Sequence, residues 1–163
     1  MIRTFRLALA AAAFGTTLPA LAAQPQTGTA VKTAITGQLN RYEQALNAAD
    51  IERVMALYSD DSVFMPQHSP PSVGRAAVRE AYTRVFGAIK LDIRFQIDEI
   101  RLLSRDWAFA RTRSSGTATA VGSDQPGGPE ANQELFLFHR ETDGQWRFAR
   151  YIFTTTNPPP RPN

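Results

Sequence analysis

The sequence predicts an α+β fold in which three N-terminal helices pack on a strongly curved, mostly antiparallel sheet. The first observation is element order: helical apolar spacings dominate the first half of residues 31–156, and alternating strand patterns dominate the second half. The second is residues 132–156, which read as two strands joined at Asp143-Gly144, where Gly supplies the positive φ of a hairpin turn. The chain has 163 residues with no cysteine, ten Phe and two Trp, so it can bury one substantial core.

Residues 1–22 are predicted to be a signal peptide that is removed. Residues 1–6 are basic, residues 7–20 are apolar and alanine-rich, and Ala20-Leu21-Ala22 is a small-residue cleavage site. The apolar run is short and interrupted, so it does not predict a transmembrane anchor. We therefore expect a periplasmic or secreted protein with no membrane attachment after cleavage.

Three helices are expected after a polar linker at residues 23–30. The first is marked by apolar residues at spacings of three and four, namely Val31, Ile35, Leu39, Tyr42 and Leu46. Asp50 is placed to cap a short second helix over 51–58. A third helix is expected over 75–89, after Gly74.

The strands follow with different lengths. A turn at 59–61 precedes a brief strand over 62–65, and residues 67–74 form a proline-containing loop. Long strands are predicted over 91–103 and 107–121, followed by a flexible loop at 122–129. The tail at 157–163 is too rich in proline to join a sheet.

The final hairpin has a predicted register. If Asp143-Gly144 are its two turn residues, Thr142 faces Gln145, Phe136 pairs with Tyr151, and Phe138 pairs with Ala149. One face then holds Glu134, Phe136, Phe138, Ala149, Tyr151 and Phe153. The other holds Leu135, Leu137, His139, Trp146, Phe148, Arg150 and Ile152. Both faces are largely apolar, so we expect both to be covered, one by helices and the other by a second sheet or subunit.

Four segments carry a family resemblance when taken in order: residues 42–50, 57–66, 74–80 and 143–153. They read YEQALNAAD, LYSDDSVFMP, GRAAVRE and DGQWRFARYIF. Together they resemble the NTF2-like superfamily, and within it the SnoaL-like, DUF4440 and SgcJ/EcaC group. The resemblance implies a cone with a pocket at its open end, and many members form homodimers through the outer sheet face. Because the same cone hosts isomerases, dehydratases and plain binding modules, the activity stays open.

The expected pocket is lined by aromatic side chains suited to a flat, apolar small molecule. The predicted lining residues are Tyr42, Tyr58, Phe64, Tyr82, Phe86, Trp107, Phe136, Tyr151 and Phe153. These residues could instead fill the core completely. His68, in the loop at the expected mouth, and Glu134, at the start of the inward-facing series, are the two candidates for acid–base catalysis. His68 could equally be only solvated, and Glu134 could mark a solvated strand end.

Several classes of site are not predicted. Two histidines 71 positions apart, without cysteine, give no metal-ligand spacing, and no glycine loop for a phosphate or dinucleotide cofactor is present. Removing the two arginines of the signal segment from the 18 basic residues leaves 16, against 15 acidic residues, so no basic surface for nucleic acid is expected. The sequence thus predicts an exported, dimeric, cofactor-independent protein that binds a small hydrophobic molecule, with isomerase- or dehydratase-type catalysis as an open possibility. A non-catalytic binding module, or an interaction module with a filled core, is the alternative.

Overall fold

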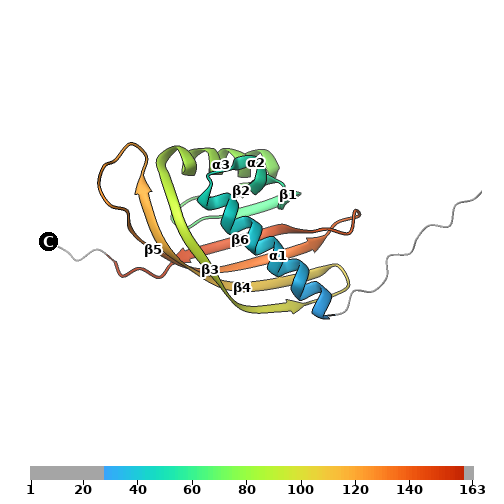
Figure 1. Ribbon diagram of the computed structural model, residues 1–163. Coiled ribbons are helices and arrows are strands. Elements are labelled where there is room, and N and C mark those ends of the chain that lie inside the picture. Colours follow the sequence, from blue (N-terminus) through green and yellow to red (C-terminus); the bar gives the residue numbers. More distant parts are fainter. Residues whose placement is uncertain (1–27, 160–163) are drawn as a thin grey trace, which may run out of the picture.

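The computed structural model describes residues 28–159 and consists of three helices packed on one side of a curved sheet (Figure 1). The predicted signal peptide and most of the linker lie outside the described residues, as do residues 160–163. The elements are α1 (Gly28–Asn47), α2 (Ile51–Met55), β1 (Tyr58–Met65), β2 (Ser72–Val73), α3 (Arg75–Ala88), β3 (Ile89–Leu102), β4 (Trp107–Ala120), β5 (Gly128–Arg140) and β6 (Trp146–Thr155). The six strands lie in the order β2-β1-β6-β5-β4-β3, so the predicted fold class is confirmed.

The helices follow the sequence pattern closely. α1 begins at Gly28, three residues before its predicted start, and it buries the predicted apolar stripe against the sheet. Asp50 caps α2 as expected, because its carboxylate accepts a hydrogen bond of 3.0 Å from the Arg53 backbone N–H. Among residues 28–159, no helix has the length and apolar character needed to cross a membrane.

The segment around β1 differs from its prediction. Tyr58 begins β1 instead of ending the second helix, and Ser59-Asp60-Asp61 lie within the strand instead of forming a turn. β1 runs parallel to β6, and the Phe148 N–H donates to the Leu57 carbonyl at 2.8 Å, which joins the start of β1 to the sheet. The predicted loop at 67–74 contains the short strand β2, which pairs with β1.

A β-bulge corrects the predicted register of the final hairpin. Phe136 pairs with Tyr151 as expected, but Phe138 pairs with Phe148, which leaves Ala149 as the extra residue. The turn is also longer than two residues, because the Gly144 N–H donates to the Glu141 carbonyl at 2.8 Å. The bulge reverses which side of the sheet the β6 residues before Ala149 face.

As a result, the predicted division of the hairpin faces is wrong for Trp146 and Phe148. Both are buried on the helix side, with 2% and 0% of their surface exposed. On the outer face, Leu135 and Ile152 are each 45% exposed in the single chain. The outer face is thus less apolar than predicted, and the inner face is more so.

The sheet also contains one very close strand approach. In β4, Gly116 lies opposite Ile93 of β3, and a Cβ added to it would sit 2.0 Å from the Asp92 carbonyl oxygen. No side chain fits in that space, so glycine allows β3 and β4 to stay paired along their length.

Candidate functional site

Aromatic side chains from both helices and strands fill the interior of the cone. Six of the predicted pocket residues are at most 5% exposed, and their rings pack on one another, some face to face and some edge to face: Tyr42, Tyr58, Phe64, Tyr82, Phe136 and Tyr151. The tightest stack joins Phe136 and Tyr151, with ring centroids 4.1 Å apart and planes 5° from parallel. The predicted clustering is therefore correct, but these rings occupy the space between the helices and the sheet and act as core.

Three tyrosine hydroxyls meet within this core. Tyr82 on α3 shares a hydrogen bond of 2.7 Å with the hydroxyl of Tyr58 and a second hydrogen bond with the hydroxyl of Tyr42. Burial raises the pKa of all three well above that of an exposed tyrosine, so they remain protonated. The network gives each of these buried hydroxyls a partner and links α1, β1 and α3.

Glu134 is a buried carboxyl on the inner face of β5. Thr112 Oγ1 and Ser114 Oγ, both on β4, donate hydrogen bonds of 2.5 Å to its two oxygens. Burial raises the pKa of Glu134, while these hydroxyl donors oppose that shift. The inward direction expected for Glu134 is correct, and its 4% exposure shows that it does not mark a solvated strand end.

The hydrogen-bond partners of Glu134 were not predicted from the sequence. Thr112 and Ser114 alternate along β4, and that spacing places both on the inner face, where they pair with the β5 residues Glu134 and Asn132. Asn132 extends the network by donating to Ser114 Oγ at 3.4 Å and to Glu130 at 2.8 Å. Their alternation is the signal from which they could have been found.

The open space lies at the mouth of the cone. We call a cavity of about 670 Å³ the mouth groove. It lies between residues 66–72, one face of α3 from Ala77 to Ala88, and the rings of Phe64 and Phe153. Ala77, Ala81 and Val85 of α3 supply an apolar wall. Glu134 does not line the groove, but it pairs with Phe153 across the β5–β6 ladder.

Two other predicted pocket residues, Phe86 and Trp107, are not among the fully buried rings. Phe86 is half-buried beside Tyr82, with ring centroids 5.7 Å apart. Trp107 packs against His139 on the outer face, with ring centroids 4.5 Å apart and planes tilted by 39°, because its neighbour Ala108 is the residue that points into the core. The prediction that Trp107 lines the inner pocket is therefore wrong.

His68 is exposed and adopts a positive φ of 57° in the loop between β1 and β2. Its neighbours Gln67 and Ser69 line the mouth groove, whereas His68 does not. The structure thus does not bring the two predicted acid–base residues together at the mouth groove: His68 is exposed on the loop, Glu134 is buried on β5, and neither lines the groove.

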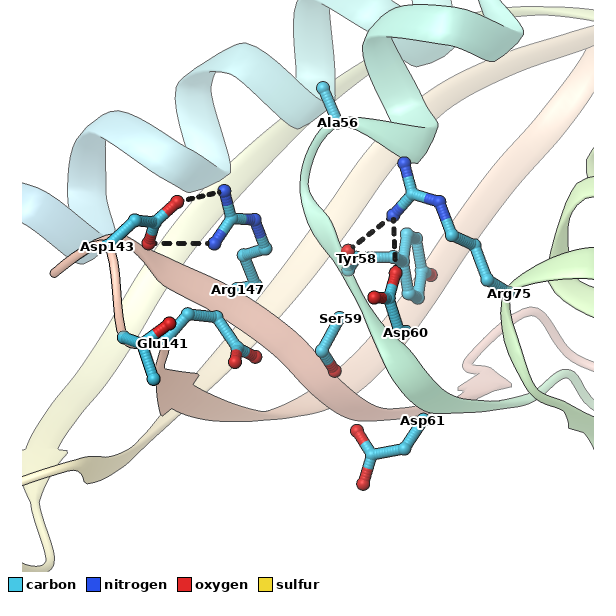
Figure 2. Close-up of a pocket in the computed structure, with 10 residues that line it drawn as sticks. Ala56, Tyr58, Ser59, Asp60, Asp61, Arg75, Glu141, Asp143 and Arg147 are labelled. Atoms are coloured by element: carbon cyan, nitrogen blue, oxygen red, sulfur yellow. Dashed lines mark hydrogen bonds and ion pairs between the residues drawn. The ribbon is translucent and has the colours of Figure 1, made fainter.

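A second, charged cavity of about 680 Å³ lies where the β5–β6 turn meets β1 and α3 (Figure 2). We call it the hairpin-end pocket. Arg147 donates to both carboxylate oxygens of Asp143, at 3.0 and 2.6 Å, and this pairing lowers the pKa of Asp143 to about 2. Across the cavity, Arg75 donates to the Tyr58 carbonyl at 2.8 Å and lies 3.9 Å from Asp60. Within residues 28–159, no group of three or more His, Asp or Glu side chains could hold a metal ion.

Comparison with solved structures finds the same fold in proteins with different names. The chain is 36% identical to a ketosteroid isomerase-like protein from Erwinia carotovora, with a TM-score of 0.73 over 77% of this chain and 96% of that one. An NTF2-like superfamily protein from Salmonella enterica is 19% identical, with a TM-score of 0.71 over 81% of this chain and 95% of that one. A Novosphingobium aromaticivorans protein named after scytalone dehydratase is 21% identical, with a TM-score of 0.68 over 78% and 85% of the two chains.

The family assignment follows from a match over most of the described fold. Residues 39–150 match the family model of the SnoaL-like domain, from the middle of α1 into β6. The protein is a member of the SnoaL-like domain family and has the NTF2-like fold.

Proposed function

We propose that the protein binds a flat, mostly apolar small molecule in the mouth groove. The observation that carries this proposal is the groove itself, whose volume of about 670 Å³ falls in the range of small-molecule sites. Phe64 and Phe153 form one side of it and are stacked 5.9 Å apart with planes 25° from parallel. Phe64 is only 3% exposed and supports Phe153 from within the core, so the half-buried Phe153 ring is the aromatic surface on which a ligand can stack.

Polar groups at the rim would orient such a ligand. Glu80 and Arg84 of α3 line the groove, and their closest approach of 4.0 Å, with side chains 74% and 69% exposed, leaves both available to a ligand. Gln67 accepts a hydrogen bond of 2.5 Å from the Thr155 N–H, which holds the 66–72 segment against β6. The best ligand is therefore a ring system with one polar substituent at its edge.

Acid–base catalysis of the isomerase or dehydratase type is the second candidate function. It is favoured by Glu134, a carboxyl whose pKa is raised by burial, as is common for groups that accept and return a proton in active sites. The ketosteroid isomerase-like name of the 36% identical relative points the same way. Glu134 does not line the mouth groove, so catalysis there requires a side-chain movement that brings substrate and carboxyl together. His68 remains the other predicted catalytic residue, and its exposure makes it the weaker of the two.

The proposal also covers the location of the protein and its oligomeric state. Residues 1–22 have the pattern of a cleaved export signal, which supports a periplasmic or secreted location. The exposed Leu135 and Ile152 beside a groove of about 410 Å³ on the outer face support homodimer formation through the sheet.

The binding proposal is tested with a pair of alanines on α3. Ala77 lines the mouth groove, whereas its neighbour Ala76 is exposed outside it. We expect Ala77→Phe to weaken binding of 2-naphthol roughly tenfold or more by filling the groove, and Ala76→Phe to leave it unchanged. Isothermal titration calorimetry measures both, and equal affinities for the two variants would place the ligand elsewhere. Native mass spectrometry of protein purified from its own compartment then identifies the natural ligand.

The two catalytic candidates can be tested once a substrate that the protein converts has been identified. Glu134→Gln keeps the shape of the side chain and removes its proton-transfer chemistry, so we expect loss of kcat by about 100-fold or more. His68→Ala is the parallel test of the other candidate. If both variants retain full turnover, the protein binds its ligand without the catalysis proposed here.

A further inference from the structure

We propose a second binding site, for a small oxyanion, at the opposite end of β6 from the mouth groove. Its cavity of about 380 Å³ is lined by Arg41 of α1, Arg53 of α2 and Arg147 of β6, and we call it the arginine pocket. Three guanidinium groups from three separate elements thus face one cavity. This site is independent of the function proposed for the mouth groove.

The charges in the arginine pocket are not balanced by its own walls. No carboxylate lines the cavity. Arg147 is paired with Asp143, but the Arg53 guanidinium donates only to the amide oxygen of Gln44 at 3.2 Å, and the Arg41 guanidinium has no hydrogen bond or ion pair with any residue of the 28–159 region. Two positive charges therefore share a concave surface without a counter-ion, a setting that attracts a negatively charged ligand.

The geometry of the side chains indicates the chemical class of the ligand. A guanidinium presents a planar fork of donors that matches the paired oxygens of a carboxylate or phosphate. The Arg147–Asp143 pair already displays this arrangement in the protein itself. Ala56 and Leu57 add an apolar surface, and the volume suits a single ring, so the ligand is a compact oxyanion with an apolar body.

The neighbouring hairpin-end pocket explains why the ligand would be small. The two cavities share Ala56 and Arg147, and Asp60, Asp61 and Glu141 line the hairpin-end side (Figure 2). A long polyanion lying across the arginine pocket would run into these carboxylates and be repelled. A nucleic acid or an anionic membrane surface is therefore a poor occupant, whereas a discrete small anion avoids the acidic side.

Calorimetric titration with phenyl phosphate and with benzoate tests this site and separates the two oxyanion chemistries. We expect at least one of them to bind the intact protein, and Arg41→Gln and Arg53→Gln each to weaken that binding roughly tenfold, because each removes a charged donor. Arg94→Gln is the matched control. Its side chain is 87% exposed on β3 and lies outside the pocket, yet the change removes the same charge. Circular dichroism on heating verifies that every variant is folded.

The outcomes are distinct. Tighter binding of phenyl phosphate assigns a phosphate ligand, and tighter binding of benzoate assigns a carboxylate. The proposal is overturned if neither probe binds with a Kd below about 10 mM. It is also overturned if Arg94→Gln weakens binding as much as Arg41→Gln and Arg53→Gln do, because the effect would then come from net charge alone.

Discussion

Glu134 is buried and accepts hydrogen bonds from only two hydroxyl groups, so its ionisation lowers the stability of the folded protein as pH rises. Its side chain lies inside the cone, where the charged form loses most of its hydration, and only Thr112 and Ser114 replace that water. The folded protein therefore holds the proton of Glu134 to higher pH than the unfolded chain does.

The sign of the effect on stability follows from this raised pKa. The free energy of unfolding is largest below the ordinary pKa of a glutamate, and it falls as pH rises through the raised pKa of Glu134 in the folded state. We expect Glu134→Gln to remove that fall, so its stability relative to wild type should increase between pH 4 and pH 8. Urea denaturation at a series of pH values measures the difference, and parallel curves for the two proteins would contradict the expectation.

Tyr82 is the central member of the hydroxyl network and should matter more than the residues at its ends. Tyr82→Phe leaves the buried hydroxyls of Tyr42 and Tyr58 without their shared partner, which should lower the free energy of unfolding by about 1–3 kcal/mol. Tyr58→Phe removes only one contact and should cost less. Chemical denaturation compares the two, and a Tyr82→Phe protein as stable as wild type would show that the network contributes no net stability.

Single residues also show where sequence patterns mislead. The alternation of the hairpin correctly directed Glu134 and Phe136 inward, because those positions precede the bulge in β5–β6 pairing. Trp107 was misplaced because a large aromatic residue normally marks the buried face. Here Ala108 and Ala110 are the fully buried residues of β4 nearest to Trp107, and their small side chains leave room for the rings of the core.

At the level of elements, local signals predicted most helices and strands, and long-range pairing caused the errors. Asp50 capped α2 as expected since a cap depends on neighbouring backbone groups. Residues 59–61 looked like a turn, yet they lie within β1, in the irregular stretch between Tyr58 and Val63, the residues that pair with Phe148 and Arg150 of β6. The bulge at Ala149 likewise follows from how two strands fit together, and a two-residue turn count could not reveal it.

The close approach of β3 and β4 gives a prediction at this scale. Gly116→Ala places a methyl group against the Asp92 carbonyl, so the strands must separate, and we expect a loss of about 2 kcal/mol or more. Gly87→Ala on α3 is the matched control, because nothing lies within 4 Å of its added Cβ and alanine favours a helix. Thermal unfolding ranks the two. If Gly116→Ala unfolds at the wild-type temperature, the strands tolerate a wider spacing than the structure indicates.

For the whole molecule, the testable feature is the outer face of the sheet. If two copies pair there, Leu135→Asp or Ile152→Asp should convert a dimer to a monomer, because each would bury an unpaired charge in the interface. Leu103→Asp is a suitable control, since Leu103 is 57% exposed in the turn after β3, away from this face. Analytical ultracentrifugation reads the outcome directly. A monomeric wild-type protein would rule out pairing through the sheet.

The position of β6 in the sheet sets the order in which the chain can be assembled. β6 follows every other described strand in sequence, yet it lies between β1 and β5. During translation, β1 and its short partner β2 therefore cannot join the other strands of the sheet until the ribosome has released residues 146–155. A nascent chain that stops short of Trp146 therefore carries two open strand edges, one on β1 and one on β5, and each is free to pair with another chain until β6 fills the gap.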